Sequence, residues 1–576
     1  MNMNSDQQTE ETALLSRGSE DASINGDASL EQKCHDHNMG LHKAPILLSL
    51  WLGSFLVSID GTIVANITNA IAADFQESDK KQWIATSFLL TNTAFQCLYG
   101  KLSDISGRKF ALLTAQLFFG LGCLLTCFAR NVTEFSLARA VCGIGGGGIS
   151  AMSSITVSDI CTAKERGMYQ GYANIVFGTG QLLGAPLGGL LITSVGWKPI
   201  FAVQVPMVML CMFLAYRNVN TKLAHLKPIE ERFSFDNISR LDLIGSASLV
   251  ISIGGVLFLL STDLNKTAVV VCTTLSIALF AYNERFWARE RIIPFELLRG
   301  NFGLTSSVTV ASTFVIFGDI FRSPIYLQLV QDVSVAKSGI FILFGSIATA
   351  SASLVTGYIT RHTKMDLAKC SFLVILAAVF LQLIGTVLSS VLVATLDPNQ
   401  TSYAREGQSA TIFELDSNGY LWKCLYVIAT ILNSFGYGCL LVSVLVSIVF
   451  TVPKYQQATL TGIFYLWRSI GSVLGTSISL STYDTTLKSS LWRYMSAHGI
   501  LESYPRLLRD SGYLRAHFSG KELSALLKVY RQCFVWSFGP NLVLGTISFG
   551  LGLILVTTVT RGQKVLDRVN AGIVGE

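Results

Sequence analysis

The sequence Gly100-Lys101-Leu102-Ser103-Asp104-Ile105-Ser106-Gly107-Arg108-Lys109 lies between two apolar runs, at residues 84–100 and 110–129. Its glycines permit a tight turn between two helices. Asp104 can accept hydrogen bonds from helix-start amides or pair with an arginine. Short cytosolic loops of membrane proteins are enriched in lysine and arginine, so Arg108 and Lys109 favour the cytosol. The stretch therefore predicts a cytosolic turn between two membrane-spanning helices.

The composition of the whole chain also indicates a membrane protein. Of the 576 residues, 51% are hydrophobic and only 14% are charged, whereas soluble domains carry about 25% charged residues. This composition excludes an ordinary soluble enzyme and a disordered scaffold. The net charge of +6 is not concentrated in a basic run interleaved with aromatic residues, so no nucleic-acid partner is expected. The expected partner of the apolar surface is the lipid bilayer.

Fourteen apolar runs are candidates to cross a bilayer core of about 30 Å, which takes about 20 residues of helix. The predicted fold class is therefore an all-α polytopic membrane protein with 14 transmembrane helices. The second run is short, and the run at 457–481 is unusually polar. The runs are residues 46–68, 84–100, 110–129, 136–157, 171–193, 199–216, 241–262, 267–287, 303–326, 338–359, 370–395, 422–451, 457–481 and 534–559.

The distribution of basic residues predicts the orientation. With the N-terminus in the cytosol, the short cytosolic loops hold 18 lysines and arginines and the opposite short loops hold 8. This asymmetry predicts cytosolic N- and C-termini. Asn131, Asn265 and Asn399 begin sequons on the non-cytosolic side and are candidate N-glycosylation sites. The segment 482–533 lies on that side too, and its apolar spacing predicts an amphipathic helix on the lumenal surface.

Residues 1–45 form a separate N-terminal segment. The first 43 residues carry eight acidic and three basic side chains and no apolar core, so they are not a signal peptide. They are predicted to be a disordered cytosolic tail. Glu10, followed by Leu14 and Leu15, has the form of an acidic dileucine sorting signal, which a sorting adaptor would recognise.

Four segments resemble the major facilitator superfamily. The loop from Gly100 to Lys109 resembles its GxLaDrxGrk signature, which in that family latches the two halves together on the cytosolic side. Arg139 and the glycines that follow it resemble the R-x-x-x-G motif. The stretch Ile59-Asp60-Gly61-Thr62-Ile63-Val64 resembles the LDxTIV signature of the 14-span drug:proton antiporter family. The resemblance implies a gating loop made of Gly100, Asp104, Gly107, Arg108 and Lys109.

The fourth segment, Gly180-Gln181-Leu182-Leu183-Gly184-Ala185-Pro186-Leu187-Gly188-Gly189, resembles the GPxxGG motif of proton antiporters in this superfamily. It departs from the motif because Ala185 separates the usual Gly-Pro pair. A proline removes a backbone hydrogen bond, and glycines allow close approach between helices. A helix bend is therefore expected here. Its residues are Gly180, Gly184, Pro186, Gly188 and Gly189.

The resemblance extends from about residue 45 to 560 and is nearest to the fungal vacuolar basic amino acid transporters. It implies two six-helix halves that rock about a central site. The predicted organisation is a cytosolic tail (1–45), a first half (46–216), a cytosolic linker (217–240), two extra helices (241–287), a second half (303–559) with its lumenal loop (482–533), and a cytosolic tail (560–576).

Buried carboxylates are the candidate proton sites, because all seven histidines lie outside the predicted spans. Asp60 and Asp319 lie inside spans. An ionised carboxylate in hydrocarbon costs several kcal/mol, so it must face a cavity, pair with a cation or take up a proton. Protons and a small cationic substrate could then compete for one carboxylate, which is the basis of antiport.

Structural alternatives exist for both carboxylates. Asp60 could form a packing hydrogen bond with Thr62 or Asn66, and Asp319 could form a structural pair with Arg322, three residues on. The resemblance favours Arg139 as a residue that binds a substrate carboxylate or steadies the proton site. The secondary candidates are Arg468, Arg322 and Glu284.

These features predict a proton-coupled antiporter that moves basic amino acids from the cytosol into the vacuole, as a multi-pass protein of the vacuolar membrane. The substrate and the vacuole rest on the resemblance and on the dileucine pattern. The proton gradient is the expected energy source, so no cofactor is expected. No catalytic triad, nucleotide loop or metal-binding spacing is present, so an enzyme and a metal site are not expected. Two alternatives remain, a plasma-membrane multidrug or organic cation:proton exporter and a non-transporting nutrient sensor.

Overall fold

The computed structural model describes residues 32–573 with internal gaps. The gaps are 35, 78–81, 224–225, 227–228, 233, 235–241, 262–265, 289–299, 334, 396–419, 452–456 and 519, and within 500–518 only Tyr504, Leu507, Leu514, His517 and Phe518 are described. Glu10, Leu14, Leu15, Asn265 and Asn399 lie outside the described residues.

Each of the predicted apolar runs coincides with helix to within two residues at its ends, and the run at 267–287 continues into a π-helical turn. This confirms the all-α fold class. The first half contains α2 (Lys43–Asp74), α3 (Gln82–Ser106), α4 (Arg108–Phe128), α5 (Val132–Ile160), α6 (Ala163–Val195) and α7 (Lys198–Asn218). The linker contains α8 (Ile229–Arg232) and the extra pair is α10 (Leu243–Ser261) and α11 (Lys266–Tyr282), which ends in a π-turn, η2 (Asn283–Trp287). The second half contains α12 (Asn301–Leu329), α13 (Val335–His362), α14 (Leu367–Thr395), α16 (Tyr420–Thr451), α17 (Gln457–His498) and α20 (Gly520–Ile573).

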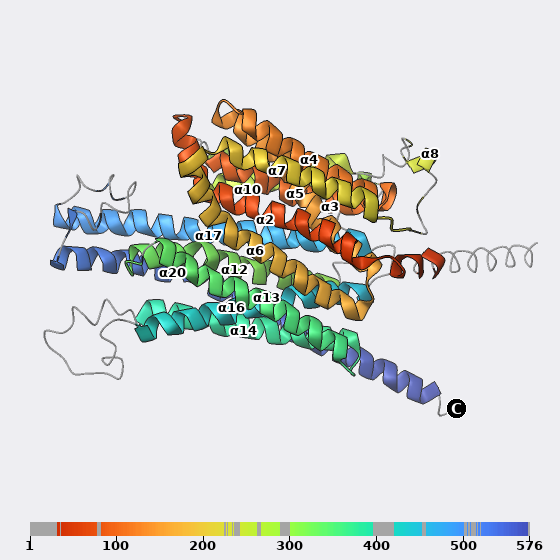
Figure 1. The fold of residues 1–576 in the computed structure, drawn as a ribbon. Coiled ribbons are helices and arrows are strands. Elements are labelled where there is room, and N and C mark those ends of the chain that lie inside the picture. The colour runs from red at the N-terminus through yellow and green to blue at the C-terminus, as the bar shows by residue number, and fades with distance from the viewer. Residues whose placement is uncertain are drawn as a thin grey trace, which may run out of the picture.

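The two halves repeat one pattern of helix packing. In the first half α2 packs on α6, α3 on α5, and α4 on both α5 and α7. In the second half the helices at the same places pair in the same way: α12 on α17, α13 on α16, and α14 on both α16 and α20. In Figure 1, α2, α4, α5 and α7 lie above α12, α14, α16 and α20. The bundle is therefore built from two structural repeats.

The halves meet through two helix pairs, α6 with α13 and α3 with α17. Ten helices of the described chain are long and apolar enough to cross a membrane, and α3, α6 and α17 are not among them. These three helices turn part of their surface towards the other half instead of lipid, so they carry polar residues that a lipid-facing helix excludes. This position explains why the runs at 84–100 and 457–481 are short or polar in sequence.

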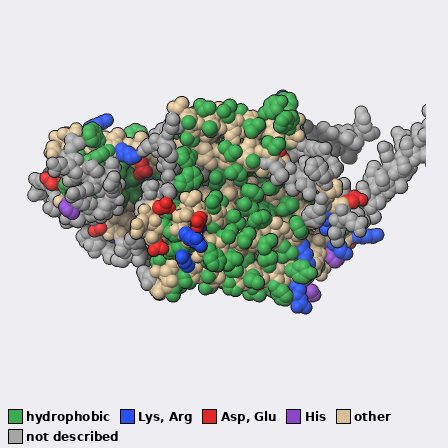
Figure 2. Space-filling model, turned by 90° about the horizontal axis from the view of Figure 1, so that it is seen from above, with side chains coloured by type: hydrophobic (Ala, Val, Ile, Leu, Met, Phe, Trp, Pro, Cys, Tyr) green, Lys and Arg blue, Asp and Glu red, His purple; other side chains and the backbone are tan. Residues whose placement is uncertain are grey.

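The surface shows the apolar band that a bilayer requires. Figure 2 shows a broad face of hydrophobic side chains, and Lys, Arg and His gather at the end where α2 begins. The last residues of α20 lie at that same end (Figure 1). A chain with an even number of crossings has this arrangement, as the basic-residue count predicts.

The turn between α3 and α4 is shorter than the sequence predicts. Gly100 lies inside α3, which continues to Ser106. Only Gly107 separates the two helices, and its φ of 94° is in the left-handed region that favours glycine. One residue therefore makes the whole reversal, because nothing between Gly100 and Ser106 interrupts helical hydrogen bonding.

Within the segment 482–533, most of the described residues are helical and extend two helices of the second half. The described residues 482–498 and 520–533 extend α17 and α20 beyond the bundle at the end opposite the termini (Figure 1). Tyr483 stacks on Phe534 with ring centroids 4.2 Å apart, and Leu487, Leu491 and Tyr530 are buried in the same cluster. The two helices cover each other's apolar faces, because direct packing removes that surface from water without a membrane surface.

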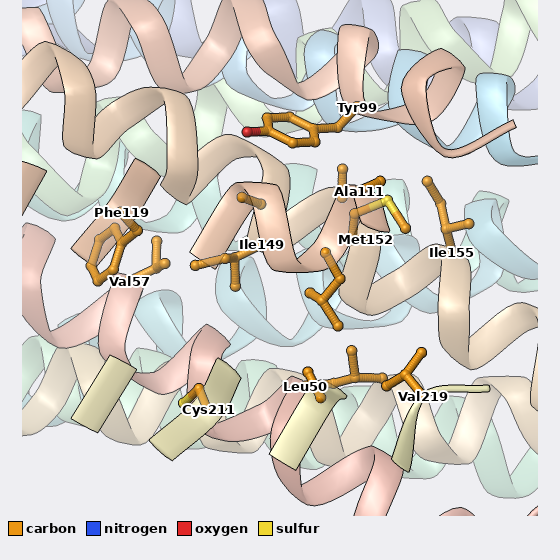
Figure 3. Packing of buried hydrophobic residues seen from close by; sticks show 14 of the residues in the cluster. Leu50, Val57, Tyr99, Ala111, Phe119, Ile149, Met152, Ile155, Cys211 and Val219 are labelled. Atoms are coloured by element: carbon orange, nitrogen blue, oxygen red, sulfur yellow. The ribbon is translucent and has the colours of Figure 1, made fainter. Parts of the chain in front are cut away.

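The glycines after Arg139 allow α5 to lie between α3 and α4. A Cβ at Gly143 or Gly147 would collide with α3, and a Cβ at Gly145 would collide with the backbone of Phe119 on α4. Small residues let membrane helices approach closely and gain van der Waals contact. Val57, Phe119 and Ile149 gather in the resulting core (Figure 3).

We expect Gly145→Leu to destabilise the bundle, because overpacking a close contact costs about 1–3 kcal/mol or more. The measurement is the thermal unfolding midpoint of the purified protein in detergent, together with its size-exclusion profile. Gly550→Leu on α20 is the control, because a Cβ there meets no atom within 4 Å. Equal unfolding midpoints for the two variants would contradict the close packing of α4 and α5.

Candidate functional site

The first charged cluster is an ion pair inside the first half. Arg139 of α5 donates from Nη1 to Oδ2 of Asp60 on α2 at 2.7 Å, and the two side chains are 1% and 0% exposed. Gln204 of α7 approaches the other carboxylate oxygen at 3.4 Å. The Arg139 guanidinium also lies 4.5 Å from the ring centroid of Phe88. Pairing offsets the cost of burying each charge.

Thr62 is not the partner of Asp60. Its hydroxyl donates to the backbone carbonyls of Ser58 and Ile59, each at 3.1 Å. The structure thus brings together two predicted site residues, Asp60 and Arg139, in an ion pair, whereas the side chain of Asn66 lies outside the described residues.

The second charged cluster lies in the second half around Asp319 of α12. Arg322 and Asn433 of α16 both donate to the Asp319 carboxylate, and Asn541 of α20 donates to it at 3.0 Å. Arg322 donates to the Ser537 carbonyl at 2.7 Å. Asp319 is 13% exposed while Arg322 is fully buried. The predicted Asp319–Arg322 pair therefore exists, but it belongs to a larger network.

The two clusters occupy equivalent places in the two repeats. Asp60 lies on the first helix of its half and is contacted from the fourth and sixth helices, α5 and α7. Asp319 lies on the first helix of the second half and is contacted from its fourth and sixth helices, α16 and α20. Both aspartates follow a phenylalanine by five positions, Phe55 and Phe314.

Sequence reasoning missed the three amides that hold these carboxylates, Gln204, Asn433 and Asn541. The signal was available, because an amide inside an apolar run needs a hydrogen-bond partner. The partner itself could not be identified without the packing of the helices.

Two adjoining cavities lie between the halves, with volumes of about 320 Å³ and 110 Å³. Arg139 lines the larger cavity and Asp319 lines the smaller one, whereas Asp60 lines neither of these two. Both cavities share a set of lining residues: Asn174, Phe177, Gln181, Phe317 and Arg468. Asp319 is thus the carboxylate open to a ligand, and Asp60 is enclosed behind Arg139.

The secondary candidates separate into two groups. Arg468 of α17 is half-buried, and its guanidinium lies 5.8 Å from the ring centroid of Phe177. Glu284 is fully buried in η2, at the end of the extra helix pair, close to Cys97 of α3. Arg468 therefore belongs to the central site, and Glu284 lies where the extra pair meets α3.

The predicted gating loop forms an ion network that reaches the second half. Arg108 contacts Asp104 at 2.6 Å and Asp159 of α5 at 2.7 Å. The Thr459 hydroxyl, near the start of α17, donates to Asp104 at 3.2 Å. Lys109 donates to the Asn220 side chain at 3.0 Å. The loop thus connects α3, α4 and α5 to a helix of the other half.

A second ion pair lies near this end of the bundle. Lys43 at the start of α2 donates to Glu165 at 2.9 Å, and Glu165 also completes a capping box with Thr162 at the start of α6. The hydrogen bond from Lys43 lowers the pKa of Glu165. The carboxylate therefore remains ionised near neutral pH.

The antiporter motif forms a packing face of α6. Gly180 and Gly184 lie against Ser58 and Thr62 of α2, where a Cβ would collide, and Gly188 lies against Ile63. The helix is continuous through Pro186 and Gly189.

Among the predicted sequons, Asn131 caps α5 by accepting a hydrogen bond from the Glu134 amide at 2.7 Å.

Comparisons with known proteins agree with this architecture. The family model described as Major Facilitator Superfamily matches residues 50–476. Vacuolar basic amino acid transporter 1 of Saccharomyces cerevisiae is 57% identical over 92% of this chain and 94% of its own length. Multidrug resistance protein fnx1 of Schizosaccharomyces pombe is 32% identical over 95% of this chain and 96% of its own.

A solved structure shows the same fold. The human organic anion transporter MFSD10 superposes with a TM-score of 0.53 over 88% of this chain and 99% of its own, at 15% sequence identity.

We expect Asp60→Asn and Arg139→Gln each to lower the free energy of unfolding by about 3–5 kcal/mol, because each leaves a buried charge without its partner. The measurement is folded yield and thermal midpoint in detergent. The double variant Asp60→Asn/Arg139→Gln removes both charges, so we expect it to recover part of the loss. A double variant whose loss equals the sum of the single losses would contradict a direct pair.

Proposed function

Since this chain belongs to the major facilitator superfamily, we propose that it is a proton-coupled secondary transporter that moves basic amino acids from the cytosol into the vacuole. The observation that carries this proposal is the 57% identity, over nearly the whole of both chains, to a protein named as a vacuolar basic amino acid transporter. Identity that high over that length supports a shared substrate class and a shared vacuolar membrane.

The geometry between the halves suits such a transporter. The larger cavity, at about 320 Å³, is of the size of small-molecule sites, about 300–1,000 Å³. The halves bond to each other beyond the cavities, where Thr459 donates to Asp104, and at the cavity wall, where Asn174 donates to Ser353 at 2.9 Å. The contact between Thr459 and Asp104 lies at the predicted cytosolic end, and we expect it to favour closure of the site towards the cytosol.

Asp319 is the best-placed group for exchange between a proton and a cation. It is part-exposed to the smaller cavity, and two neutral amides as well as Arg322 contact it. An amide can stay beside either the ionised or the protonated carboxyl, because it offers both a donor and an acceptor. A proton and a cationic side chain could therefore alternate at this carboxylate, with the proton gradient as energy source.

Asp60 has a different part in the proposal. It is enclosed and bonded to Arg139, so we assign it the fixed counter-ion that keeps Arg139 charged and aimed at the larger cavity. A plasma-membrane exporter of multiple drugs is the second candidate, favoured by the 32% identity to a protein named for multidrug resistance.

The test uses sealed vacuolar vesicles with an acidic interior, prepared with and without this protein from cells that lack their own basic amino acid carriers. We expect the protein to add uptake of radiolabelled lysine, arginine and histidine, and a protonophore to abolish that uptake. No added uptake in vesicles shown to contain the protein would reject the proposal and favour the exporter.

We expect Asp319→Asn to lower gradient-driven lysine uptake at least tenfold, because asparagine cannot exchange a proton for a cation. The control is Asp332→Asn. Asp332 is an exposed residue just beyond α12, and asparagine also tolerates its φ of 54°. Uptake is measured per amount of protein in the vesicles. If Asp319→Asn took up lysine at the wild-type rate, the Asp319 carboxylate would have no role in coupling proton and substrate movement.

A further inference from the structure

Arg468 differs from the other arginine that lines the central cavities. Arg139 is neutralised by Asp60 at 2.7 Å, but within the described chain Arg468 has no carboxylate within ion-pairing distance and no hydrogen-bond acceptor. Its contacts are with two rings, Phe177 at 5.8 Å and Tyr465 at 5.7 Å from the guanidinium. A guanidinium carries five N–H donors, and here they are open to the cavities.

Placing the Arg468 charge inside the membrane costs free energy. Arg468 lies near the middle of the predicted span 457–481, where a charge is retained only if it faces a partner or a water-filled cavity. Arg322 is fully buried, and its charge is paired with that of Asp319. Arg468 faces the cavities instead, since it lines both of them.

The neighbouring side chains place Arg468 at the boundary between the two halves. Tyr465, Ser469 and Ser472 lie on the same face of α17 and line the larger cavity with it. Ser469 donates to Gln96 of α3 at 2.9 Å, which ties this face to the other half. Rings of both halves contact the guanidinium, because Phe177 belongs to α6 and Tyr465 to α17. The charge therefore lies between rings of the two halves, at the wall of both cavities.

We propose that Arg468 binds the α-carboxylate of the amino acid substrate, while Asp319, which lines the smaller cavity with it, binds the cationic part. This inference rests on the proposed transport of basic amino acids and adds the group that recognises them as amino acids. Arginine and carboxylate form a two-point, charge-assisted pair. A substrate that lacks the carboxylate leaves the guanidinium unpaired, so the site discriminates against simple amines.

The test compares lysine with cadaverine, which has the same chain and terminal ammonium groups but no carboxylate, and with lysinamide. In wild-type vesicles we expect cadaverine and lysinamide to inhibit radiolabelled lysine uptake about 10- to 100-fold more weakly than unlabelled lysine does. In Arg468→Gln we expect lysine to lose about that factor and the discrimination between lysine and cadaverine to disappear. Arg468→Lys should retain part of it.

The matched control is Arg493→Gln, because Arg493 is an exposed arginine of the same helix beyond the membrane-spanning part. It should keep wild-type uptake and wild-type discrimination. Thermal stabilisation of each purified variant by lysine and by cadaverine gives the same ratio without transport, so a variant that folds but does not transport is still informative.

The outcomes separate the two proposals. A wild-type protein that carries no basic amino acid overturns the proposed function and this inference with it. A wild-type protein that carries lysine but does not distinguish it from cadaverine overturns only the carboxylate site. So does an Arg468→Gln variant that loses lysine and cadaverine equally, because a structural role would lower both.

Discussion

A charge inside a bilayer has to be paired or has to face water, and the interior of this bundle is organised around that constraint. Each repeat holds a carboxylate on its first helix and brings side chains from its fourth and sixth helices to it. In the first half the partner from the fourth helix is an arginine, and the pair is enclosed. In the second half it is an amide, and the carboxylate remains part-exposed. The same framework thus gives one fixed charge and one accessible charge.

The constraint also explains which helices are polar. A helix surrounded by lipid cannot present hydrogen-bonding side chains, but a helix between the halves can. α3 and α17 meet each other across the interface, and Gln96 and Ser469 bond there. The low apolar content of these helices is therefore a consequence of their place beside the cavity. The same place puts Arg468 within reach of a ligand.

Close backbone contact between helices is the second requirement of the fold. The glycines after Arg139 let α5 lie against α3 and α4 together, which brings Arg139 to Asp60. Gly180 and Gly184 do the same between α6 and α2. These glycine motifs are therefore packing surfaces, and the charged site depends on the helix spacing that they permit.

The sequence by itself determined the class of fold and the position of the helices, because a 30 Å apolar barrier leaves a long apolar run few other structures. It also showed which carboxylates and arginines lie within the membrane. Tertiary structure alone decided that Asp60 pairs with Arg139, that amides far along the chain hold Asp319, and that Arg468 has no acidic partner among the described residues. It also decided that residues 482–498 and 520–533 extend α17 and α20 and pack on each other. These outcomes depend on contacts between helices distant in sequence, and the periodicity of one helix carries no information about which neighbour its polar face will meet.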